Sequence, residues 1–195
     1  MKLKKVVVTV LVSMMIVAGR SSAETITQIA IMDAGAISFF SIEFYKDDKV
    51  LHGSEGITFT NLDTTQSWCL PDGRASGDGK SDTGVICRTN MNLLWYLKLS
   101  ASTASSGFNL ANFKYYIGQP WNRKLGTSAD GSLAKSPGWY SIPGAPTTVY
   151  TAGTQDKNNY EPGTLATFSY AIYPEGMTGG STYVINITYT LTTDA

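Results

Sequence analysis

The sequence is poor in the residues from which catalytic and metal sites are usually built. Among its 195 residues there are two cysteines and one histidine, His52. One histidine cannot supply the usual ligand set of a zinc site, and without a G-x-S-x-G elbow His52 has no recognisable nucleophile to activate. Paired carboxylates for glycoside cleavage are open only by elimination, at Glu43, Glu55, Glu161 and Glu175. We therefore expect a protein that is not an enzyme and holds no cofactor.

Long apolar runs are missing as well, except for one at the N-terminus. Three early lysines precede an apolar run over residues 6–19, and the small residues Ser21 and Ala23 follow. This order is typical of a secretory signal peptide, and the run is short for a membrane span. We expect a signal peptide over residues 1–23, a single domain over 24–195, and an exported protein with no membrane association after cleavage. A retained N-terminal anchor is the alternative.

Basic runs are absent from the remainder of the chain. Four of the fifteen Lys and Arg residues lie in the first 23 positions and none of the fifteen Asp and Glu residues does, so the exported part has a net charge of −4. Such a surface is a poor partner for nucleic acid or anionic lipid.

Helix signals are scarce, and the strongest patterns alternate with a period of two. In residues 181–192, STYVINITYTLT, the tyrosines, isoleucines and leucine fall on one face, and the threonines at 182, 188 and 190 fall on the other with Val184 and Asn186. Residues 164–173, TLATFSYAIY, alternate in the same way, and a glycine-rich turn joins the two segments. The pattern predicts two strands that form a hairpin.

Further strands are predicted between turn-forming segments. They cover residues 26–31, 37–45, 57–61, 93–100, 113–117 and 147–151. Loops are expected over 118–146 and 152–163, and a weak helix over 103–112. Strands at this spacing predict an all-β fold, an antiparallel Ig-like/Greek-key β-sandwich with long Gly/Pro-rich loops.

The segment between the two cysteines, Cys69 and Cys87, is rich in glycine and aspartate. A cysteine pair in an exported protein is expected to be oxidised, and this spacing is not that of a redox-active C-x-x-C pair. We therefore expect a structural disulfide. Asp72, Asp78 and Asp82 could instead gather calcium, although the EF-hand ligand pattern is missing and solvated turn aspartates are the simpler interpretation.

Aromatic residues concentrate in the long predicted loops. Trp121, Trp139 and Tyr140 are candidates for contact with carbohydrate, because exposed aromatic faces stack on sugar rings. The alternative is that these rings pin the loops onto the sandwich. Trp95, in LLWYLKL, is expected in the core because it shares a strand face with Leu97.

Two stretches together resemble the WxL-type surface domains of Gram-positive bacteria. These are CRTNMNLLWYLKLSAS, which contains Trp95-Tyr96-Leu97, and the C-terminal STYVINITYTLTTDA. The resemblance implies a secreted β-sandwich and a non-covalent attachment to the cell wall. Tyr189 stands where the family has the tryptophan of its second motif. The length, the signal and the lack of catalytic groups are also similar to those of sandwich subunits of secreted filaments and fimbriae.

The expected function is that of a non-catalytic, secreted or cell-surface structural and adhesive subunit. Its expected partners are copies of itself, other cell-surface proteins, or a cell-wall or other polysaccharide. A carbohydrate-binding module is the alternative. Residues 24–31, ETITQIAI, are predicted to pair within their own domain or to add as a donated strand to a neighbour.

Overall fold

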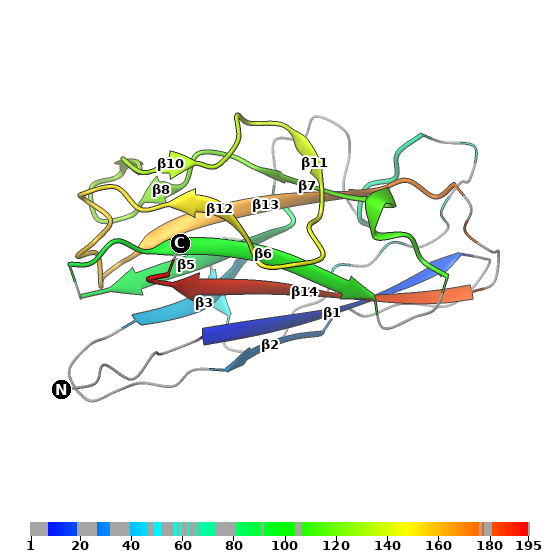
Figure 1. Ribbon diagram of the computed structural model, residues 1–195, viewed down its shortest axis with the longest axis horizontal. Helices are drawn as coiled ribbons and strands as arrows, with labels where there is room; N and C mark the ends of the chain where they lie inside the picture. Colours follow the sequence, from blue (N-terminus) through cyan, green and yellow to red (C-terminus); the bar gives the residue numbers. More distant parts are fainter. Residues whose placement is uncertain are drawn as a thin grey trace.

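The protein is an all-β sandwich of two antiparallel sheets (Figure 1). The computed structural model describes residues 8–18, 27–31, 40–46, 49–51, 57, 59, 62, 65, 67–72, 81–90, 92–103, 107–175, 177 and 181–194. Within these residues the only helical element is the short 3₁₀ turn η1 (Leu110–Asn112). None of these residues belongs to a helix with the length and hydropathy needed to cross a membrane.

The first sheet, called sheet A here, has six strands. In spatial order they are β10 (Ser132–Leu133), β12 (Thr147–Thr151), β6 (Tyr96–Thr103), β14 (Ser181–Thr192), β1 (Val8–Ala18) and β2 (Thr27–Ile31). Strand β14 is central and pairs with β6 on one side and with β1 on the other. Strand β1 therefore lies inside the segment predicted to be a signal peptide.

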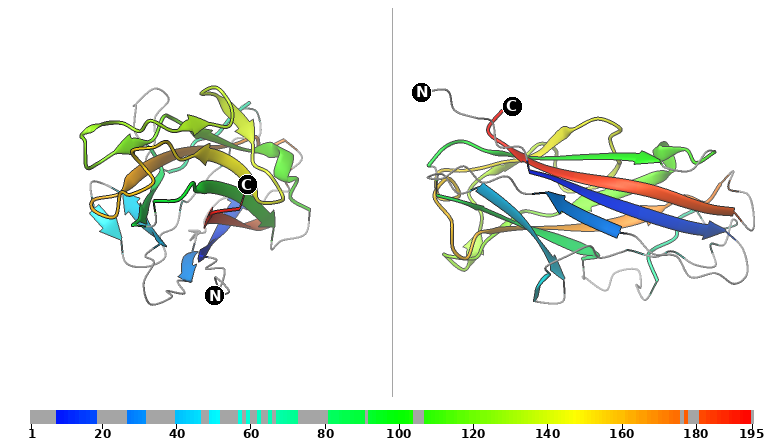
Figure 2. Two further views of the ribbon diagram at one scale, coloured as in Figure 1. Left: turned by 60° about the vertical axis from the view of Figure 1, so that its left-hand side comes forward. Right: turned by 90° about the horizontal axis from the view of Figure 1, so that it is seen from below.

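The second sheet, sheet B, packs against the first. Its main path is β11 (Trp139–Ser141), β7 (Phe113–Ile117), β13 (Thr164–Ile172), β5 (Thr83–Thr89), β3 (Phe40–Lys46) and β4 (Lys49–Leu51). Two short strands, β8 (Trp121–Asn122) and β9 (Thr127–Ser128), extend it because β8 also pairs with β13. Figure 2 shows the two layers from the end and from below.

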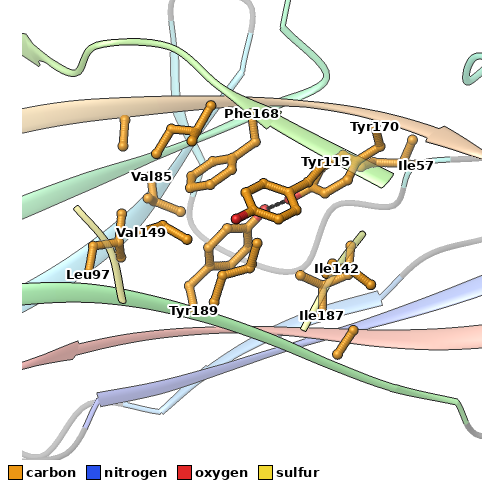
Figure 3. Close-up of a cluster of buried hydrophobic side chains, with 14 of the residues drawn as sticks. Ile57, Val85, Leu97, Tyr115, Ile142, Val149, Phe168, Tyr170, Ile187 and Tyr189 are labelled. Carbon is orange, nitrogen blue, oxygen red and sulfur yellow. Dashed lines mark hydrogen bonds between the residues drawn. The ribbon is translucent and has the colours of Figure 1, made fainter. Parts of the chain in front are cut away.

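The core lies between the sheets and follows the alternation read from the sequence. In β14, every second residue from Tyr183 to Leu191 is buried. Phe168 and Tyr170 of β13 face them, and the Tyr189 ring packs 5.0 Å from that of Phe168 (Figure 3). Because the inner face contains tyrosines, their hydroxyl groups must find partners. The Tyr189 hydroxyl bonds those of Tyr170 and Thr83.

Several sequence predictions are confirmed by these elements. Strands β7, β12 and β14 have the predicted bounds, and Trp95 is 1% exposed. Strand β2 begins one residue later than predicted and β3 begins three later. Of the predicted strand 57–61, the structure describes residues 57 and 59 only.

Other predictions are wrong. β13 and β14 do not form a hairpin, because β13 belongs to sheet B and β14 to sheet A. β6 begins at Tyr96 and not at residue 93 as predicted, and Leu93 is 44% exposed. β5, which is central to sheet B, falls in a segment for which no strand was predicted. The predicted helix is reduced to η1 in its described part.

Candidate functional site

The outer face of sheet B carries exposed aromatic rings contributed by separate strands. Residues directly opposite each other in an antiparallel pair point to the same face. Trp139 lies opposite Tyr116, Tyr116 lies opposite Ser169, and Trp121 lies opposite Leu165. Ser169 and Leu165 are four residues apart on β13 and so also share a face. The register therefore places Trp121, Tyr116 and Trp139 on one side of the sheet, away from the core.

The ring contacts extend this group along the sheet. The ring centres of Trp139 and Tyr116 are 5.8 Å apart, and those of Trp68 and Tyr173 are 5.5 Å apart. The Lys114 ammonium, two residues before Tyr116 on β7, lies 5.5 Å from the centre of the Trp68 ring, a cation–π contact. We call these residues the aromatic face: Trp68, Lys114, Tyr116, Trp121, Trp139 and Tyr173.

The three tryptophans of the aromatic face are about half exposed: Trp68 is 45%, Trp121 46% and Trp139 48% accessible. Trp121 and Trp139 are separated by four residues along β13 and by one strand across the sheet, so their Cα atoms are roughly 14 Å apart. This separation leaves room for an extended ligand that contacts both rings at once.

Tyr140 does not belong to this face. Its partner in the β11–β7 pair is Tyr115, which is buried, and the two rings are 6.2 Å apart. The Tyr140 hydroxyl donates to the carbonyl of Ser136 at 2.7 Å, and the Lys135 ammonium lies 4.6 Å from the ring centre. Of the three residues predicted to contact carbohydrate, the structure brings Trp121 and Trp139 to one face and turns Tyr140 to the other.

A buried polar network fixes the loop that carries Trp121. Asn122, the next residue, is 1% exposed, and its side-chain carbonyl accepts the backbone N–H groups of Lys124 and Leu125. Its amide donates to Asp156 Oδ1 at 3.2 Å. Because Asn122 points inward, the adjacent Trp121 is directed outward.

Asp156 is the centre of this network and is fully buried. Its carboxylate accepts the Tyr150 hydroxyl at 2.5 Å and the Thr164 hydroxyl at 2.9 Å, besides the Asn122 amide. Its backbone carbonyl accepts the indole N–H of Trp95 at 3.1 Å. Burial and the Asp156 carboxylate together raise the pKa of Tyr150 well above the usual tyrosine value.

The close packing around this network explains one glycine. A Cβ atom at Gly131 would lie 2.2 Å from the Tyr150 hydroxyl oxygen and from the Thr151 carbonyl oxygen. The Gly131 N–H instead donates to that hydroxyl at 2.9 Å. This network could not be predicted from the sequence, because Asp156 becomes a buried acceptor only through contacts with three separate segments of the chain.

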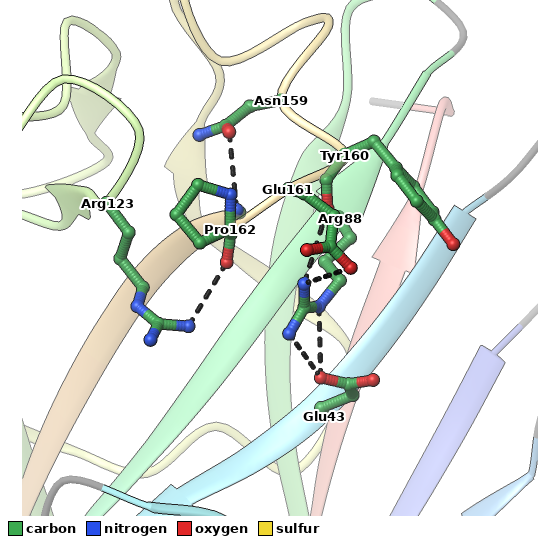
Figure 4. A network of polar contacts seen from close by, with 8 residues as sticks. Glu43, Arg88, Arg123, Asn159, Tyr160, Glu161 and Pro162 are labelled. Carbon is green, nitrogen blue, oxygen red and sulfur yellow. Dashed lines mark hydrogen bonds and ion pairs between the residues drawn. The ribbon is translucent and has the colours of Figure 1, made fainter.

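A second polar cluster lies near the C-terminal end of β5 (Figure 4). Arg88 contacts Glu43 at 2.9 Å and Glu161 at 3.5 Å, and it donates to the Tyr160 carbonyl at 3.4 Å. Nearby, Arg123 donates to the Pro162 carbonyl at 3.1 Å. Two of the carboxylates considered for glycoside cleavage are therefore ion-paired to one arginine, and this cluster joins the 160–162 loop to β3 and β5.

The predicted Cys69–Cys87 disulfide is not present, because the structure holds both residues as buried cysteines that are not bonded to each other. Cys69 pairs with Ile172 and Cys87 with Thr164, at opposite ends of β13. Eight residues of strand separate these two positions, roughly 27 Å. A disulfide needs Cα atoms within about 7 Å. Burial, and then the Asp156 charge, raise the pKa of the Cys87 thiol far above its usual value.

The aspartates considered for calcium are not gathered in the described part of the chain. Asp82 is 7% exposed and its carboxylate accepts the backbone N–H of Tyr170 at 2.6 Å, so it stabilises the start of β5 against β13. Asp72 is exposed, whereas Asp78 lies outside the described residues, as do His52 and Glu55. Among the residues that the structure describes, no three His, Cys, Asp or Glu side chains are grouped as metal ligands.

In comparisons with known proteins, no family model, no curated protein and no solved structure matches this chain. The resemblance to WxL-type domains therefore stays a prediction. Trp95, which carries part of this resemblance, is 1% exposed, and Tyr189, which stands at the position of the family's second tryptophan, is fully buried.

Proposed function

We propose that this chain is a non-catalytic, exported structural and adhesive subunit of the cell surface, and that the aromatic face is its adhesive surface. The observation that carries the proposal is the half-exposed state of Trp68, Trp121 and Trp139 on one face of a sheet. Singly scattered surface apolar residues need no explanation, but a group of them on one face is typical of an interaction site.

The ligand chemistry proposed for this face is carbohydrate. Indole and phenol rings have an apolar face beside a polar edge, which suits the mixed apolar and hydroxyl surface of a sugar. Polar groups for orientation are available beside the rings, since the Lys114 ammonium contacts both Trp68 and the Ser141 hydroxyl, the latter at 2.8 Å. The rings are placed by strands and by the Asn122–Asp156 network, so little order has to be gained on binding.

Attachment to a cell wall would use this face and not the residues of the WxL resemblance. Trp95 and Tyr189 lie in the core, where their side chains are not available to a ligand. Their part in the proposal is to stabilise the sandwich that holds the aromatic face.

A carbohydrate-binding module that serves a degradative system is the second candidate, favoured by the same pair Trp121 and Trp139. The two functions differ in what the protein does besides binding. A structural subunit assembles with copies of itself or with surface proteins, whereas a binding module acts as a monomer joined to or accompanying an enzyme.

The experiment is a depletion assay on insoluble cell-wall polysaccharide and on cellulose, chitin and xylan. We expect Trp121→Ala and Trp139→Ala each to weaken binding by about 5- to 150-fold. This corresponds to about 1–3 kcal/mol, the contribution of an aromatic ring on which a base stacks, and a similar contribution is expected here. Leu125→Ala, at a residue 50% exposed, is the matched control and should bind as the wild type does. Equal binding by all four proteins would refute the aromatic face as the ligand site.

A further inference from the structure

Among the described strands, the longest pairing joins β14 to β1. All eleven residues of β1 pair antiparallel with β14, from Val8 opposite Leu191 to Ala18 opposite Ser181 (Figure 2). The register places Val8, Val10, Val12 and the alternate residues that follow opposite the buried residues of β14. Strand β1 thus completes sheet A next to a core strand.

This same strand belongs to the segment that the sequence predicts to be removed on export. After cleavage near residue 23, β14 keeps β6 on one side but loses its partner on the other, and β2 loses the one described strand with which it pairs. β14 then becomes an edge strand, and an edge strand presents a row of unpaired backbone N–H and C=O groups with which a new strand can pair. The exported protein therefore needs an occupant for the edge of β14.

The chain's own β2 is poorly placed to replace β1, because it would have to reverse direction to run antiparallel to β14 as β1 does. β2 is antiparallel to β1 and therefore runs parallel to β14, with Ile31 level with Thr190. Figure 1 shows β2 ending, and β3 beginning, at the C-terminal end of β14. To run antiparallel with Gln28 opposite Asn186, the register argued below, Ile31 would have to move from the level of Thr190 to that of Tyr183, seven residues or roughly 23 Å away. The eight residues that connect it to Phe40 reach about 32 Å when fully extended, so they span this shift and the roughly 10 Å between the sheets only as a nearly extended chain.

We propose that the edge of β14 in the exported protein is filled by residues 24–31 of a second copy of this chain, which add as an antiparallel donated strand. The segment of a second copy is not connected to β3 of the molecule whose β14 it joins, so it can pair antiparallel with β14, in the direction that β1 has here. The segment ETITQIAI alternates with Thr27, Ile29 and Ile31 on one face, as an inserted strand requires. The proposal rests on the proposed export of the chain. It specifies how copies of the subunit would associate: a strand of one copy pairs with the edge of β14 in another.

One unsatisfied atom favours a particular register for this pairing. Within the described residues, the side-chain oxygen of Asn186 is covered and makes no hydrogen bond. Asn186 lies on the outer face of β14, between the buried Ile185 and Ile187. If Thr27, Ile29 and Ile31 point inward, Gln28 points outward, and its amide can donate to Asn186. We therefore place Gln28 of the donor opposite Asn186 of the acceptor.

The test mixes two exported proteins, one with Gln28→Cys and one with Asn186→Cys, each in a Cys69→Ala, Cys87→Ala background. A disulfide requires Cβ atoms within about 4.5 Å, so donation gives a heterodimer on a non-reducing gel at least about tenfold more abundant than with Thr192→Cys as acceptor. Pairing inside one chain cannot link the two mixed proteins. An absent heterodimer, or a retained N-terminal leader by intact mass, would overturn the proposal.

A second variant guards against misfolding of the cysteine proteins. Because Val8 lies opposite Leu191, a copy of residues 8–18 joined by a turn after Ala195 can re-enter the edge in the direction of β1. This capped protein is expected to be monomeric in sedimentation, whereas the exported wild type forms oligomers. A wild type that is monomeric at the same concentration contradicts donation. The capped monomer should still bind polysaccharide, so loss of self-association and failure of the aromatic face are measured separately.

Discussion

Replacement of Asp156 by alanine tests whether the buried network stabilises the fold that presents the aromatic face. The Asp156 carboxylate is the acceptor for the Tyr150 hydroxyl, the Thr164 hydroxyl and the Asn122 amide, and the residue is fully buried. Each buried donor left without a partner costs about 1–3 kcal/mol. The hydroxyl groups can rotate toward other acceptors, so we expect a total loss of roughly 3–6 kcal/mol in the free energy of unfolding.

Such a loss is a large part of the about 5–15 kcal/mol that stabilises a typical domain. Urea unfolding followed by tryptophan fluorescence measures it, because the indole N–H of Trp95 is bonded to the Asp156 carbonyl. Asp156→Asn, which keeps one carbonyl acceptor, should lose less. Asp130→Ala is the matched control. The side chain of the exposed Asp130 accepts, among the described residues, only the backbone N–H of Gln155, so its removal should cost under about 1 kcal/mol. Equal losses for Asp156→Ala and Asp130→Ala would refute the reasoning.

The remaining predictions concern the core and its titrating groups. Trp95→Ala should cost about 3–5 kcal/mol in urea melts, as large core truncations do, and a loss below about 1 kcal/mol would contradict its burial. Non-reducing mass spectrometry should find the peptides of Cys69 and Cys87 unlinked, and a linked pair would contradict the register of β13. Burial raises the pKa of Tyr189 to about 12 and that of Tyr150 also upward, so these residues stay protonated in the folded state when the unfolded chain ionises near pH 10. The free energy of unfolding should therefore keep its full contribution from these tyrosines below pH 10 and fall above pH 10 by about 1.4 kcal/mol per pH unit for each tyrosine. Urea midpoints that do not change between pH 9 and about pH 11 would show that these pKa values are not raised.

The parts of the fold that sequence alone could predict are those in which one face of a strand is apolar. Strand β14 is the clearest, because its alternation is uninterrupted over twelve residues. Strand β5, TGVICRT, was missed because its outer face contains Gly84 and Arg88, so the alternation is weak and the flanking residues are typical of turns. The false hairpin between β13 and β14 has another cause: alternation shows that both strands are half buried, but not that they lie in different sheets.

The candidate site was predictable in part for the same physical reasons. Trp121 and Trp139 stood out as aromatic residues in polar segments, and both are exposed. Tyr140 was grouped with them because it is adjacent to Trp139, yet adjacent residues of a strand point to opposite faces. Tyr116 could have been found from the alternation of FKYYI, whereas Trp68 joins the face only through its contacts with Lys114 and Tyr173. Those contacts bring together distant parts of the chain, which local patterns do not report.

The most direct test of the adhesive role uses the four tryptophans of the chain as separate probes. In NMR spectra of the labelled protein, each indole N–H gives its own signal, assigned by single Trp→Phe variants. On titration with soluble cell-wall polysaccharide fragments, the signals of Trp121 and Trp139 should shift in a saturable manner, with that of Trp68 following as the ligand extends along the face. The signal of Trp95, which is buried and bonded to Asp156, should stay in place. Unmoved signals from Trp121 and Trp139 at saturating ligand, or a shift of Trp95 alone, would contradict the proposed function.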